Sequence, residues 1–447
     1  MKRKISNILN EWKEEKNKKS LLIEGARQVG KTYIVDEFSI QNYPQNKIIK
    51  IDLVLNEDMM SFFDGDLNPH SILGRIQRDI RFRDIDFIDD INNPYFIFID
   101  EVQESENALV SLKYFSQESS LFNVVASGSL LGVSLKRKFK KSYPVGFIQH
   151  VYMYPLDFVE FCEANGYSKQ YLLSLLNTKD INESTHQQMM NLYRDYIVVG
   201  GLPEAVKKFI ETKSYDKVFE IQKDLVIGYM QDIRKYADSN NQKIKIEKCF
   251  NSIPTHLKQQ NKKFKYKNVD ENGRKRMFED SLSWLNEAGL IIESHNLKRI
   301  DKSLQQFIDE DDFKIYMFDT GILMSMFEPE KRQLVFSGSN DYDIGGIYEN
   351  SIASILDKTN IDEIMYYSLN NELELDFVYE YKSNITILEV KSGNNLKSVS
   401  MKKYLNHNSD KSVDIYKVSS KICSDEERIK NITFYQFAIM MCINNVR

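Results

Sequence analysis

The chain has 447 residues, 42% hydrophobic and 28% charged, with a formal net charge of −5. The length predicts two to four domains, and the acidic balance excludes a protein that coats nucleic acid over its whole surface. The four cysteines are widely spaced and form no CxxC pair, which disfavours a zinc site or a disulfide framework and favours a cytoplasmic location. No apolar run approaches the length of a membrane span, so we expect no membrane partner.

The first predicted elements form a helix and then a strand, a loop and a second helix. Residues 4–19 have apolar side chains at helical spacing. The short apolar strand 21–23 leads into a loop with the spacing G-x-x-x-x-G-K-[ST], and residues 33–38 continue as a helix. This is the context that a phosphate-binding loop requires. The predicted nucleotide-binding residues are Gly25, Ala26, Arg27, Gln28, Val29, Gly30, Lys31, Thr32 and Tyr33.

The residue types in this loop have direct physical reasons. Gly25 and Gly30 allow unusual backbone dihedral angles and a close approach to phosphate. Backbone amides at the start of a helix attract anions. Lys31 can reach the β- and γ-phosphates and assist catalysis, and the Thr32 hydroxyl can ligate Mg²⁺. The loop therefore predicts nucleotide binding; the alternative is an ordinary glycine-containing turn between a strand and a helix.

A second strong pattern follows a predicted strand at 48–53 and two predicted helices within 57–92. Residues 95–99 are continuously apolar, which indicates a buried central strand, and Asp100 and Glu101 come directly after it. In P-loop ATPases an aspartate at this position supports Mg²⁺. Glu101 is then placed as the catalytic base that polarises the attacking water. The alternative is a strand that happens to end in two acids.

Residues 122–129 predict another buried strand, which ends in small polar side chains. In an additional-strand ATPase this strand lies between the two motif strands. Its tip, Ser127 or Ser129, can then sense the γ-phosphate. For either serine alone, a simple cap on the strand end is the alternative. The guanine-reading motif [NT]-K-x-D is absent from the sequence, which favours ATP over GTP.

Five segments occur in a characteristic order: GARQVGKT, FIFIDEVQ, SGSLLGVSLKRK, YPVGFIQHVYMYPLDFVEF and YIVVGGLPEAV. Together they resemble a large family of bacterial and archaeal AAA-like ATPases that carry a C-terminal domain of unknown function. The resemblance implies that Gly200-Gly201-Leu202-Pro203 closes a small helical lid near the nucleotide; a helix-breaking turn is the alternative. Many members have a basic residue where this chain has Phe147, so no arginine finger is assigned, and Arg137 and Arg194 are only candidates.

The middle of the chain changes character. Residues 166–235 predict helices, the expected lid and linker. Residues 240–300 contain 13 Lys or Arg against 7 Asp or Glu, a net of +6. Predicted helices at 244–257 and 275–288, followed by a strand at 290–294 and a polar turn, are typical of a winged helix, and family members are similar here. Such a basic helix can lie in a DNA major groove with lysines on phosphates. The residues predicted to contact DNA are Lys262, Lys263, Lys265, Lys267, Arg274, Lys275 and Arg276. A solvated basic face that docks another domain is the alternative.

The last region begins after a predicted polar linker at 331–346. A helix continues through residue 356, and strands at 374–379 and 385–391 are joined by a short turn. Asp376 is followed thirteen residues later by a Glu-x-Lys pattern, Glu389 and Lys391, which resembles a restriction-endonuclease-like nuclease core.

The proposed chemistry of this C-terminal pattern follows from strand geometry. Glu389 and Lys391 lie two apart on a strand and share a face. Asp376 would meet them from the paired strand, and Glu349 could add an acid from the helix. Two carboxylates can hold magnesium, and a lysine can activate water. The alternative is a solvated acidic strand face.

The sequence thus predicts an α/β protein. It comprises a P-loop NTPase (AAA-like) parallel sheet core with a helical lid, a winged-helix-like middle region and a restriction-endonuclease-like C-terminal α/β domain. The expected ranges are 1–165 for the ATPase core, 166–236 for the lid and linker, 237–330 for the winged-helix-like domain and 331–447 for the nuclease-like domain.

The main functional hypothesis is an ATP-binding protein, a Mg²⁺-dependent ATPase that acts as a nucleotide-driven switch and is coupled to DNA. One alternative is an ATP-regulated DNA nuclease. Another is an ATP-binding regulatory or defence module with little turnover. The candidate partners are ATP or ADP, DNA, and a partner protein or a second copy of the chain.

Overall fold

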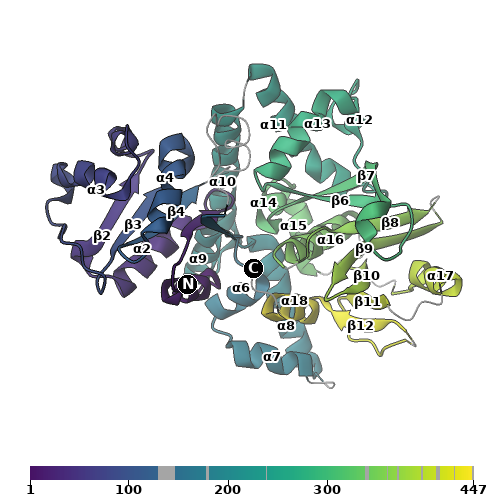
Figure 1. Ribbon diagram of the computed structural model, residues 1–447. Coiled ribbons are helices and arrows are strands. Elements are labelled where there is room, and N and C mark those ends of the chain that lie inside the picture. Colours follow the sequence, from purple (N-terminus) through teal and green to yellow (C-terminus); the bar gives the residue numbers. More distant parts are fainter. Residues whose placement is uncertain are drawn as a thin grey trace. The chain divides into compact units, whose positions relative to one another are not determined.

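Figure 1 shows the computed structural model of the protein. It describes residues 1–128, 146–177, 181–237, 239–337, 342–359, 361–369, 372–393, 396–408, 413–426 and 428–444. The chain forms two compact units, residues 2–154 and residues 155–447 together with Met1. Each unit has its own β-sheet.

The first unit contains a five-stranded parallel sheet with the order β2-β3-β4-β1-β5. Its strands are β1 (Ser20–Glu24), β2 (Ile48–Asp52), β3 (Tyr95–Asp100), β4 (Phe122–Gly128) and β5 (Ile148–Tyr152). β3 and β4 are buried along their whole length, because a parallel sheet is covered on both faces. β4 lies between β1 and β3, as predicted for an additional-strand ATPase. The loop after β1 and the acids at the end of β3 therefore lie at the same edge of the sheet.

Helices cover both faces of this sheet (Figure 1). They are α1 (Ile5–Glu14), α2 (Lys31–Asn42), α3 (Pro69–Gln77) and α4 (Glu106–Gln117). Alternate residues of β3 serve the two faces. Ile97 and Ile99 belong to a hydrophobic cluster with residues of α3 and α4. Phe96 instead contacts Phe38 of α2, whose ring also contacts Trp12 of α1.

The segment 57–92 differs from its prediction. It contains one α-helix, α3, and two 3₁₀ turns at Glu57–Phe63 and Ile80–Phe82, instead of two helices. Gly65 has a φ of 76°, which stops the first turn from continuing, and Asn68 then caps α3 through the His70 amide. Gly65 and the cap at Asn68 therefore limit the α-helix to α3, although the pattern of charged and apolar residues predicted two helices.

The second unit begins with five helices that follow one another along the chain. They are α6 (Phe158–Ala164), α7 (Lys169–Asn177), α8 (Glu183–Val199), α9 (Pro203–Thr212) and α10 (Tyr215–Tyr236). In the described residues of 166–235, the predicted helical character is confirmed. Gly200 ends α8 with a φ of 73°, and Pro203 occupies the first turn of α9. The Gly-Gly-Leu-Pro motif is thus a helix-breaking turn, and its role as a lid near the nucleotide stays a prediction.

The predicted helix–helix–hairpin order of the middle region is present. It consists of α11 (Asn240–Leu257), α12 (Tyr266–Val269), α13 (Lys275–Glu287), β6 (Ile291–Leu297) and β7 (Ile308–Met317). The hairpin does not stand apart as a wing, however, because β6 also pairs in parallel with β8 (Met365–Leu369). The winged-helix prediction describes the local order of these elements but not their pairing, and the sheet runs across the expected boundary at residue 330.

The second sheet has seven strands in the order β12-β11-β10-β9-β8-β6-β7. Its other strands are β9 (Leu373–Tyr381), β10 (Asn384–Lys391), β11 (Val413–Ser419) and β12 (Lys430–Thr433). β9 and β10 form the predicted hairpin, and the turn residues Lys382 and Ser383 both have positive φ, as a tight two-residue turn requires. β10, β11 and β12 run parallel, so the sheet is mixed.

The remaining described helices are α14 (Thr320–Ser325), α15 (Pro329–Ser337), α16 (Tyr342–Asp357), α17 (Val399–His407) and α18 (Phe434–Asn444). α16, α17 and α18 pack on this sheet, whereas α14 and α15 pack mainly on other helices, α8 among them. The expected linker at 331–346 is therefore partly helical. Gly346 lies inside α16, where a Cβ would come within 2.1 Å of the Leu257 carbonyl oxygen, so this glycine reflects close packing of α16 on α11 rather than a flexible segment.

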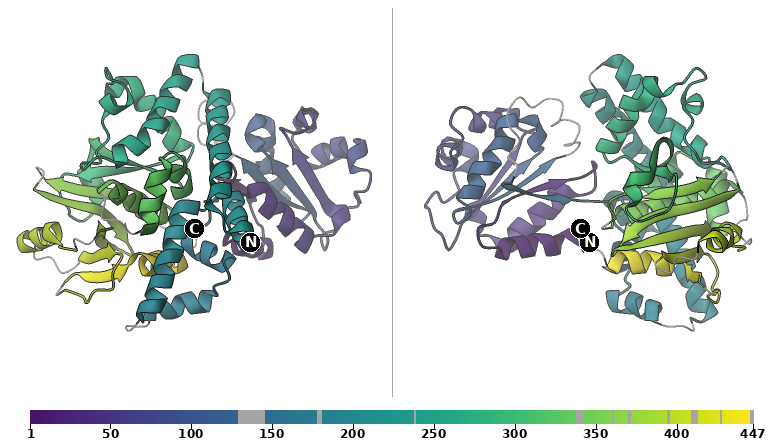
Figure 2. Two further views of the ribbon diagram at one scale, coloured as in Figure 1. Left: turned by 180° about the vertical axis from the view of Figure 1, so that it is seen from behind. Right: turned by 45° about the vertical axis from the view of Figure 1, so that its right-hand side comes forward.

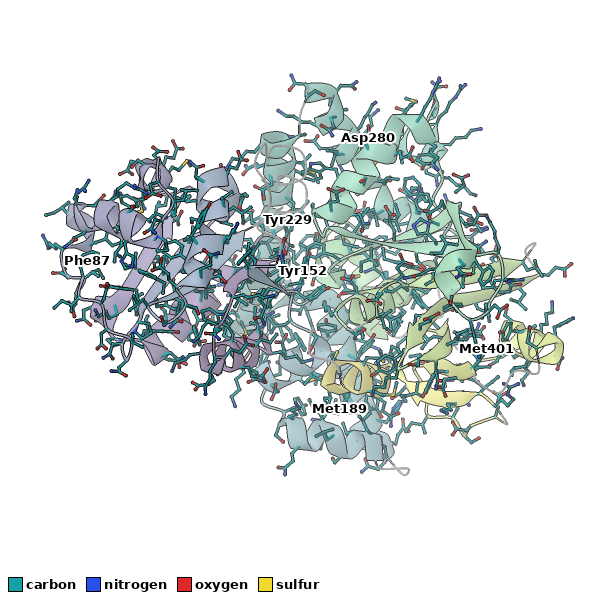
Figure 3. The ribbon with its side chains drawn as sticks, in the orientation of Figure 1. Phe87, Tyr152, Met189, Tyr229, Asp280 and Met401 are labelled. Atoms are coloured by element: carbon teal, nitrogen blue, oxygen red, sulfur yellow. The ribbon has the colours of Figure 1, made fainter. Side chains whose placement is uncertain are left out.

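Figure 2 shows the seven-stranded sheet in its green to yellow colours from two further directions. On one face, Met401 and Tyr404 of α17 are buried with Leu375 and Ile387 of the sheet (Figure 3). Asp280 of α13 is exposed to solvent and carries no such packing (Figure 3). Among the residues that the structure describes, no helix is both long and apolar enough to cross a membrane.

Candidate functional site

The phosphate-binding loop has the geometry that its sequence predicts. Gly30 precedes α2 with a φ of 96°, and Gly25 has a φ of 153°. A Cβ at Gly25 would lie 2.2 Å from the Met153 carbonyl oxygen, so only glycine fits there. Lys31 is 7% exposed, and its ammonium group donates to the carbonyl oxygens of Gly25 and Ala26 at 2.9 Å each. The cation is thus held inside the loop, where phosphate oxygens would bind.

Three predicted residues meet at the carboxyl ends of neighbouring strands. The Thr32 hydroxyl donates to Asp100 Oδ2 at 2.7 Å, and the Ser127 hydroxyl donates to Asp100 Oδ1. Burial raises the pKa of Asp100, while these two hydrogen bonds lower it and the charge of Glu101 raises it further. Hydroxyl and carboxylate oxygens are the ligands that Mg²⁺ prefers, so Thr32 and Asp100 suit the predicted metal.

Glu101 lies beside this group with an unusual backbone. Its φ is 55°, and its side chain accepts a hydrogen bond from Gln103 Nε2. A non-glycine residue in the left-handed region is uncommon and occurs at functional sites. Gln103 was not predicted as a functional residue, although its position two residues after Glu101 was visible in the segment FIFIDEVQ.

Asp52 is a second residue that the sequence reasoning missed. It ends β2 directly opposite Asp100 in the parallel register. Its Oδ1 accepts hydrogen bonds from the backbone amides of Val54 and Leu55 at 3.0 and 2.8 Å. The sequence signal that could have identified Asp52 is its position near the end of the predicted strand 48–53, as with Asp100 after the strand 95–99.

The other residues predicted for the nucleotide site have different outcomes. Ser127 contacts Asp100, and its role as a sensor stays a prediction, whereas Ser129 and Arg137 lie outside the described residues. Phe147 lies under the Lys113 ammonium, which is 5.2 Å from the ring centre. Arg194 donates to the Asn191 side chain within α8 at 2.9 Å. These contacts assign no arginine finger.

The Gly-Gly-Leu-Pro turn is packed against Asp319, a residue that the sequence did not single out. Asp319 is 1% exposed and accepts hydrogen bonds from the Gly201 amide at 2.7 Å and the Ile322 amide at 3.1 Å. A Cβ at Gly200 would lie 2.3 Å from Asp319 Oδ1. Burial raises the pKa of Asp319, although the charge of Lys358 lowers it. The two glycines of the turn are therefore explained by close packing.

The four residues of the C-terminal prediction come together in the second unit. Leu388 of β10 lies opposite Phe377 of β9, so the next facing residues are Glu389 and Asp376, which share a face. The Lys391 ammonium is 2.6 Å from Glu389 Oε1. The Val390 amide donates to Asp376 Oδ2 at 2.7 Å.

Two further lysines enter this acidic centre, and the sequence did not place them there. Lys262 Nζ is 2.7 Å from Glu349 Oε1, and Lys314 Nζ is 2.6 Å from Glu374 Oε1 and 3.9 Å from Glu349 Oε2. Burial and then the charge of Glu349 raise the pKa of Asp376 to about 7. Burial acts to raise the pKa of Glu349 as well, but the charges of Lys262 and Lys314 outweigh it and lower that pKa.

This centre does not fit a metal ion in its present arrangement. Within the described ranges, no group of three or more Asp, Glu, His or Cys side chains is placed to hold a metal. The lysines neutralise the acids instead. Glu389 is 3% exposed, and its Oε2 atom is buried without a hydrogen-bond partner. One carboxylate oxygen of the centre therefore stays unsatisfied.

The basic stretch between α11 and α13 is partly neutralised. Lys263 pairs with Asp312, and Lys275 pairs with Asp311 at 2.5 Å, both acids belonging to β7. Lys262 pairs with Glu349, as described above. Four of the seven predicted DNA-contacting residues are exposed: Lys265, Lys267, Arg274 and Arg276.

Comparison with known proteins locates three family matches on the chain. Residues 17–162 match the model described as an AAA domain. Residues 190–333 and 344–437 match two domains of unknown function, DUF8612 and DUF4143. The first match covers the five-stranded sheet and the phosphate loop, and the fold of this part is that of a P-loop NTPase. A comparison with curated proteins finds no match.

Three solved structures resemble the chain distantly. The Drosophila ORC bound to DNA is 12% identical with a TM-score of 0.28, over 74% of this chain and 93% of that chain. The Aeropyrum pernix ORC1 protein in complex with DNA is 12% identical with a TM-score of 0.28, over 76% of this chain and 91% of that chain. Protein VC1899 from Vibrio cholerae is 9% identical with a TM-score of 0.20, over 95% of this chain and 97% of that chain. At such TM-scores these likenesses carry no further conclusion about the chain.

Proposed function

We propose that the protein binds ATP with Mg²⁺, hydrolyses it and acts as a nucleotide-driven switch. The observation that carries this proposal is the hydrogen-bonded group of Thr32, Asp100 and Ser127 beside a phosphate loop with Lys31 inside it. The AAA domain match over residues 17–162 supports it. The strand order supports it too, because it places the loop and the acids at one edge.

Each residue has a defined role in this proposal. The Lys31 ammonium leaves the loop carbonyls and binds the β- and γ-phosphates. Thr32 and Asp100 would hold Mg²⁺, and a bound Mg²⁺ would supply positive charge to neutralise the phosphate oxygens. Glu101 orients and deprotonates the attacking water. Gln103 holds the Glu101 carboxylate by its hydrogen bond.

ATP turnover by the full-length protein, measured with and without DNA, tests the proposal. The variant Glu101→Gln should bind ATP as the wild type does but lose turnover, because an amide has the same shape and cannot accept the proton of water. Glu104→Gln, three residues further on, is the matched control. Turnover of Glu101→Gln within about twofold of the wild type would assign the base to another residue. Negligible wild-type turnover would favour the regulatory module.

An ATP-regulated DNA nuclease is the second candidate function. The observation that favours it is the meeting of Glu349, Asp376, Glu389 and Lys391 in one buried centre. The lysine pairs occupy the acids, so we derive no cleavage step. The test is Mg²⁺- or Mn²⁺-dependent DNA cleavage, with and without ATP, by the wild type and by Asp376→Ala and Lys391→Ala. Cleavage that both variants retain would come from a contaminant and would remove this candidate.

A further inference from the structure

Arg3 contacts the phosphate loop from outside it, and the proposed mechanism does not use it. Its Nη1 atom donates to the Val29 carbonyl oxygen at 3.0 Å, and its Nη2 atom donates to the Tyr154 carbonyl oxygen at 2.6 Å. Val29 immediately precedes Gly30 of the loop, and Tyr154 follows β5. The guanidinium group therefore ties the end of the loop to the chain that leaves the neighbouring strand.

Arg3 is held in place by the packed helix that follows it. Arg3 lies just before α1, whose residues Ile5, Leu9 and Trp12 are buried. The Trp12 indole donates to the Lys19 carbonyl oxygen at 2.7 Å, immediately before β1. The helix is thus attached to the sheet at its far end, and Arg3 is presented from a packed element rather than from a loose terminus.

The two ends of the loop rest on adjacent residues. Gly25 at the first end packs closely on the Met153 carbonyl group, and Arg3 joins Val29 at the second end to Tyr154. A loop that binds phosphate through backbone amides gains affinity when its conformation is already formed, because binding then costs less conformational entropy. Arg3 supplies the brace at the second end.

We propose that Arg3 is a positioning residue of the phosphate loop, and this proposal rests on ATP binding by that loop. Arg3 acts on the Val29 backbone, which lies in the loop in both the bound ground state and the transition state. Loss of the Arg3 side chain therefore weakens the binding of the ground state and of the transition state equally, so KM rises while kcat stays the same.

The test compares ATP affinity, KM and kcat for Arg3→Ala, Arg3→Lys and the wild type. We expect about a tenfold weaker affinity and higher KM for Arg3→Ala, with kcat within about twofold. Arg3→Lys should recover part of the loss, since one ammonium can reach one of the two carbonyl groups. Lys16→Ala, an exposed residue after the same helix, is the matched control and should behave as the wild type.

The outcomes separate this proposal from ATP binding itself. If the wild-type protein fails to bind ATP, both the proposed function and the proposed role of Arg3 are wrong. A wild type that binds ATP while Arg3→Ala binds within twofold of it overturns the brace alone. Circular dichroism and the thermal midpoint without nucleotide check the fold of each variant. If Arg3→Ala is unfolded, Arg3→Lys decides, and an unchanged ATP affinity for a folded Arg3→Lys overturns the proposal.

A different observation carries a second inference, in the acidic centre of the second unit. Lys262 belongs to the segment between α11 and α12, outside both α16, which supplies Glu349, and the sheet, which supplies the other acids. The side chains of Lys262 and Glu349 are only 14% and 7% exposed, and their atoms are 2.7 Å apart. Removal of such a cation leaves the Oε1 atom of a buried carboxylate without its ion pair, which is costly, although Lys314 stays 3.9 Å from Oε2. The Glu389 Oε2 atom is also buried without a hydrogen-bond partner, so it is an acceptor that a cation could use.

We infer that Lys262 is an internal cation that keeps divalent metal ions out of this centre. The inference rests on the second candidate function, in which Asp376 and Glu389 hold a metal. With Lys262 in place, its ammonium group takes the carboxylate of Glu349 that would complete the ligand set. Withdrawal of this one side chain frees Glu349 Oε1 near Asp376 and near the unpartnered Glu389 Oε2, while Lys314 stays on Glu374 and Lys391 stays on Glu389 Oε1.

Mn²⁺ binding to the full-length protein without nucleotide, followed by electron paramagnetic resonance, tests this inference. Lys262→Met should bind one Mn²⁺ at least about tenfold more tightly than the wild type. Asp376→Ala added to Lys262→Met should abolish the gain. Lys263→Met removes the neighbouring pair with Asp312 and should leave Mn²⁺ affinity unchanged.

Each result has one meaning. Equal Mn²⁺ affinity of the wild type and a folded Lys262→Met overturns the inference. So does a gain that survives Asp376→Ala. If Lys262→Met is unfolded, Lys262→Gln, which can still donate a hydrogen bond to Glu349, takes its place under the same criteria. A gain in Mn²⁺ binding without any DNA cleavage would support the internal cation and remove the nuclease candidate, so the two failures are distinguishable.

Discussion

Lys31 is the residue on which ATP binding depends most directly. Its ammonium group lies within the loop on the carbonyl oxygens of Gly25 and Ala26. We predict that Lys31→Ala loses detectable ATP binding and at least about 3 kcal/mol of transition-state stabilisation, a fall in turnover of more than a hundredfold. Equilibrium binding of a fluorescent ATP analogue and a phosphate-release assay measure the two effects. Wild-type affinity in this variant would remove the phosphate-loop assignment.

Asp376 should make the stability of the second unit depend on pH. Burial and the Glu349 charge raise its pKa to about 7, from an ordinary value of 3.8. The folded protein thus keeps a proton that the unfolded chain releases. Its stabilising contribution is complete below about pH 3.8 and is lost as the pH rises toward 7, with a slope of at most about 1.4 kcal/mol per pH unit.

The corresponding variant is Asp376→Asn, which keeps an oxygen for the Val390 amide and cannot ionise. We predict that the thermal midpoint of the wild type falls between about pH 5 and pH 7.5 more than that of Asp376→Asn does. Equal slopes for the two proteins would show that Asp376 does not retain its proton in the folded state.

At the level of elements, the basic stretch between α11 and α13 has two kinds of charge. Lys262, Lys263 and Lys275 form ion pairs with acids of α16 and β7. These pairs favour the alternative in which part of the basic face docks another part of the chain. Four residues of the predicted DNA-contacting set are exposed and remain available for phosphate contacts: Lys265, Lys267, Arg274 and Arg276.

DNA binding, if this stretch mediates it, should therefore depend on the exposed residues. We predict that replacing Lys265, Lys267, Arg274 and Arg276 by Gln weakens DNA binding and lowers the slope of log affinity against log salt by about 0.9 for each lost phosphate contact. Fluorescence anisotropy at several salt concentrations measures both. The single change Lys275→Gln, at a paired residue, is the control. An unchanged affinity of the fourfold variant would show that this face has another purpose.

At the level of the whole molecule, the second unit is larger than its sequence pattern indicates. β6 pairs with β8, and Lys262 and Lys314 pair with acids of α16 and β9, so both sides of residue 330 share one sheet and one buried centre. An isolated segment 331–447 would expose the edge of β8 and leave Glu349 without its cations.

This arrangement predicts how fragments behave. A fragment of residues 155–447 should be folded and show a cooperative thermal transition. A fragment of residues 331–447 should aggregate or lack a cooperative transition, because it has lost β6, β7 and the two lysines. Circular dichroism melting of both fragments makes the comparison. A stable, cooperative 331–447 fragment would restore the boundary that the sequence predicted.

The sequence by itself determined the features that depend on residues close together in the chain. The loop from Gly25 to Thr32, the acids after β3 and the β9–β10 hairpin were all predicted, because glycines, apolar runs and tight turns act on their own backbone. The order of β1, β3 and β4 followed from these motifs. It brings Thr32 and Asp100 into contact across 68 residues of sequence.

Only the tertiary structure decided which distant charges pair. Lys314 and Glu374 are 60 residues apart, and Gly201 and Asp319 are 118 residues apart. Nothing local specifies such partners, because a buried charge is satisfied by whichever side chain the packing brings within reach. For the same reason, local charge presented Lys262 as a DNA contact, whereas burial made it the partner of Glu349. The contact of Arg3 with Val29 likewise depends on the packing of α1, which the local sequence does not specify.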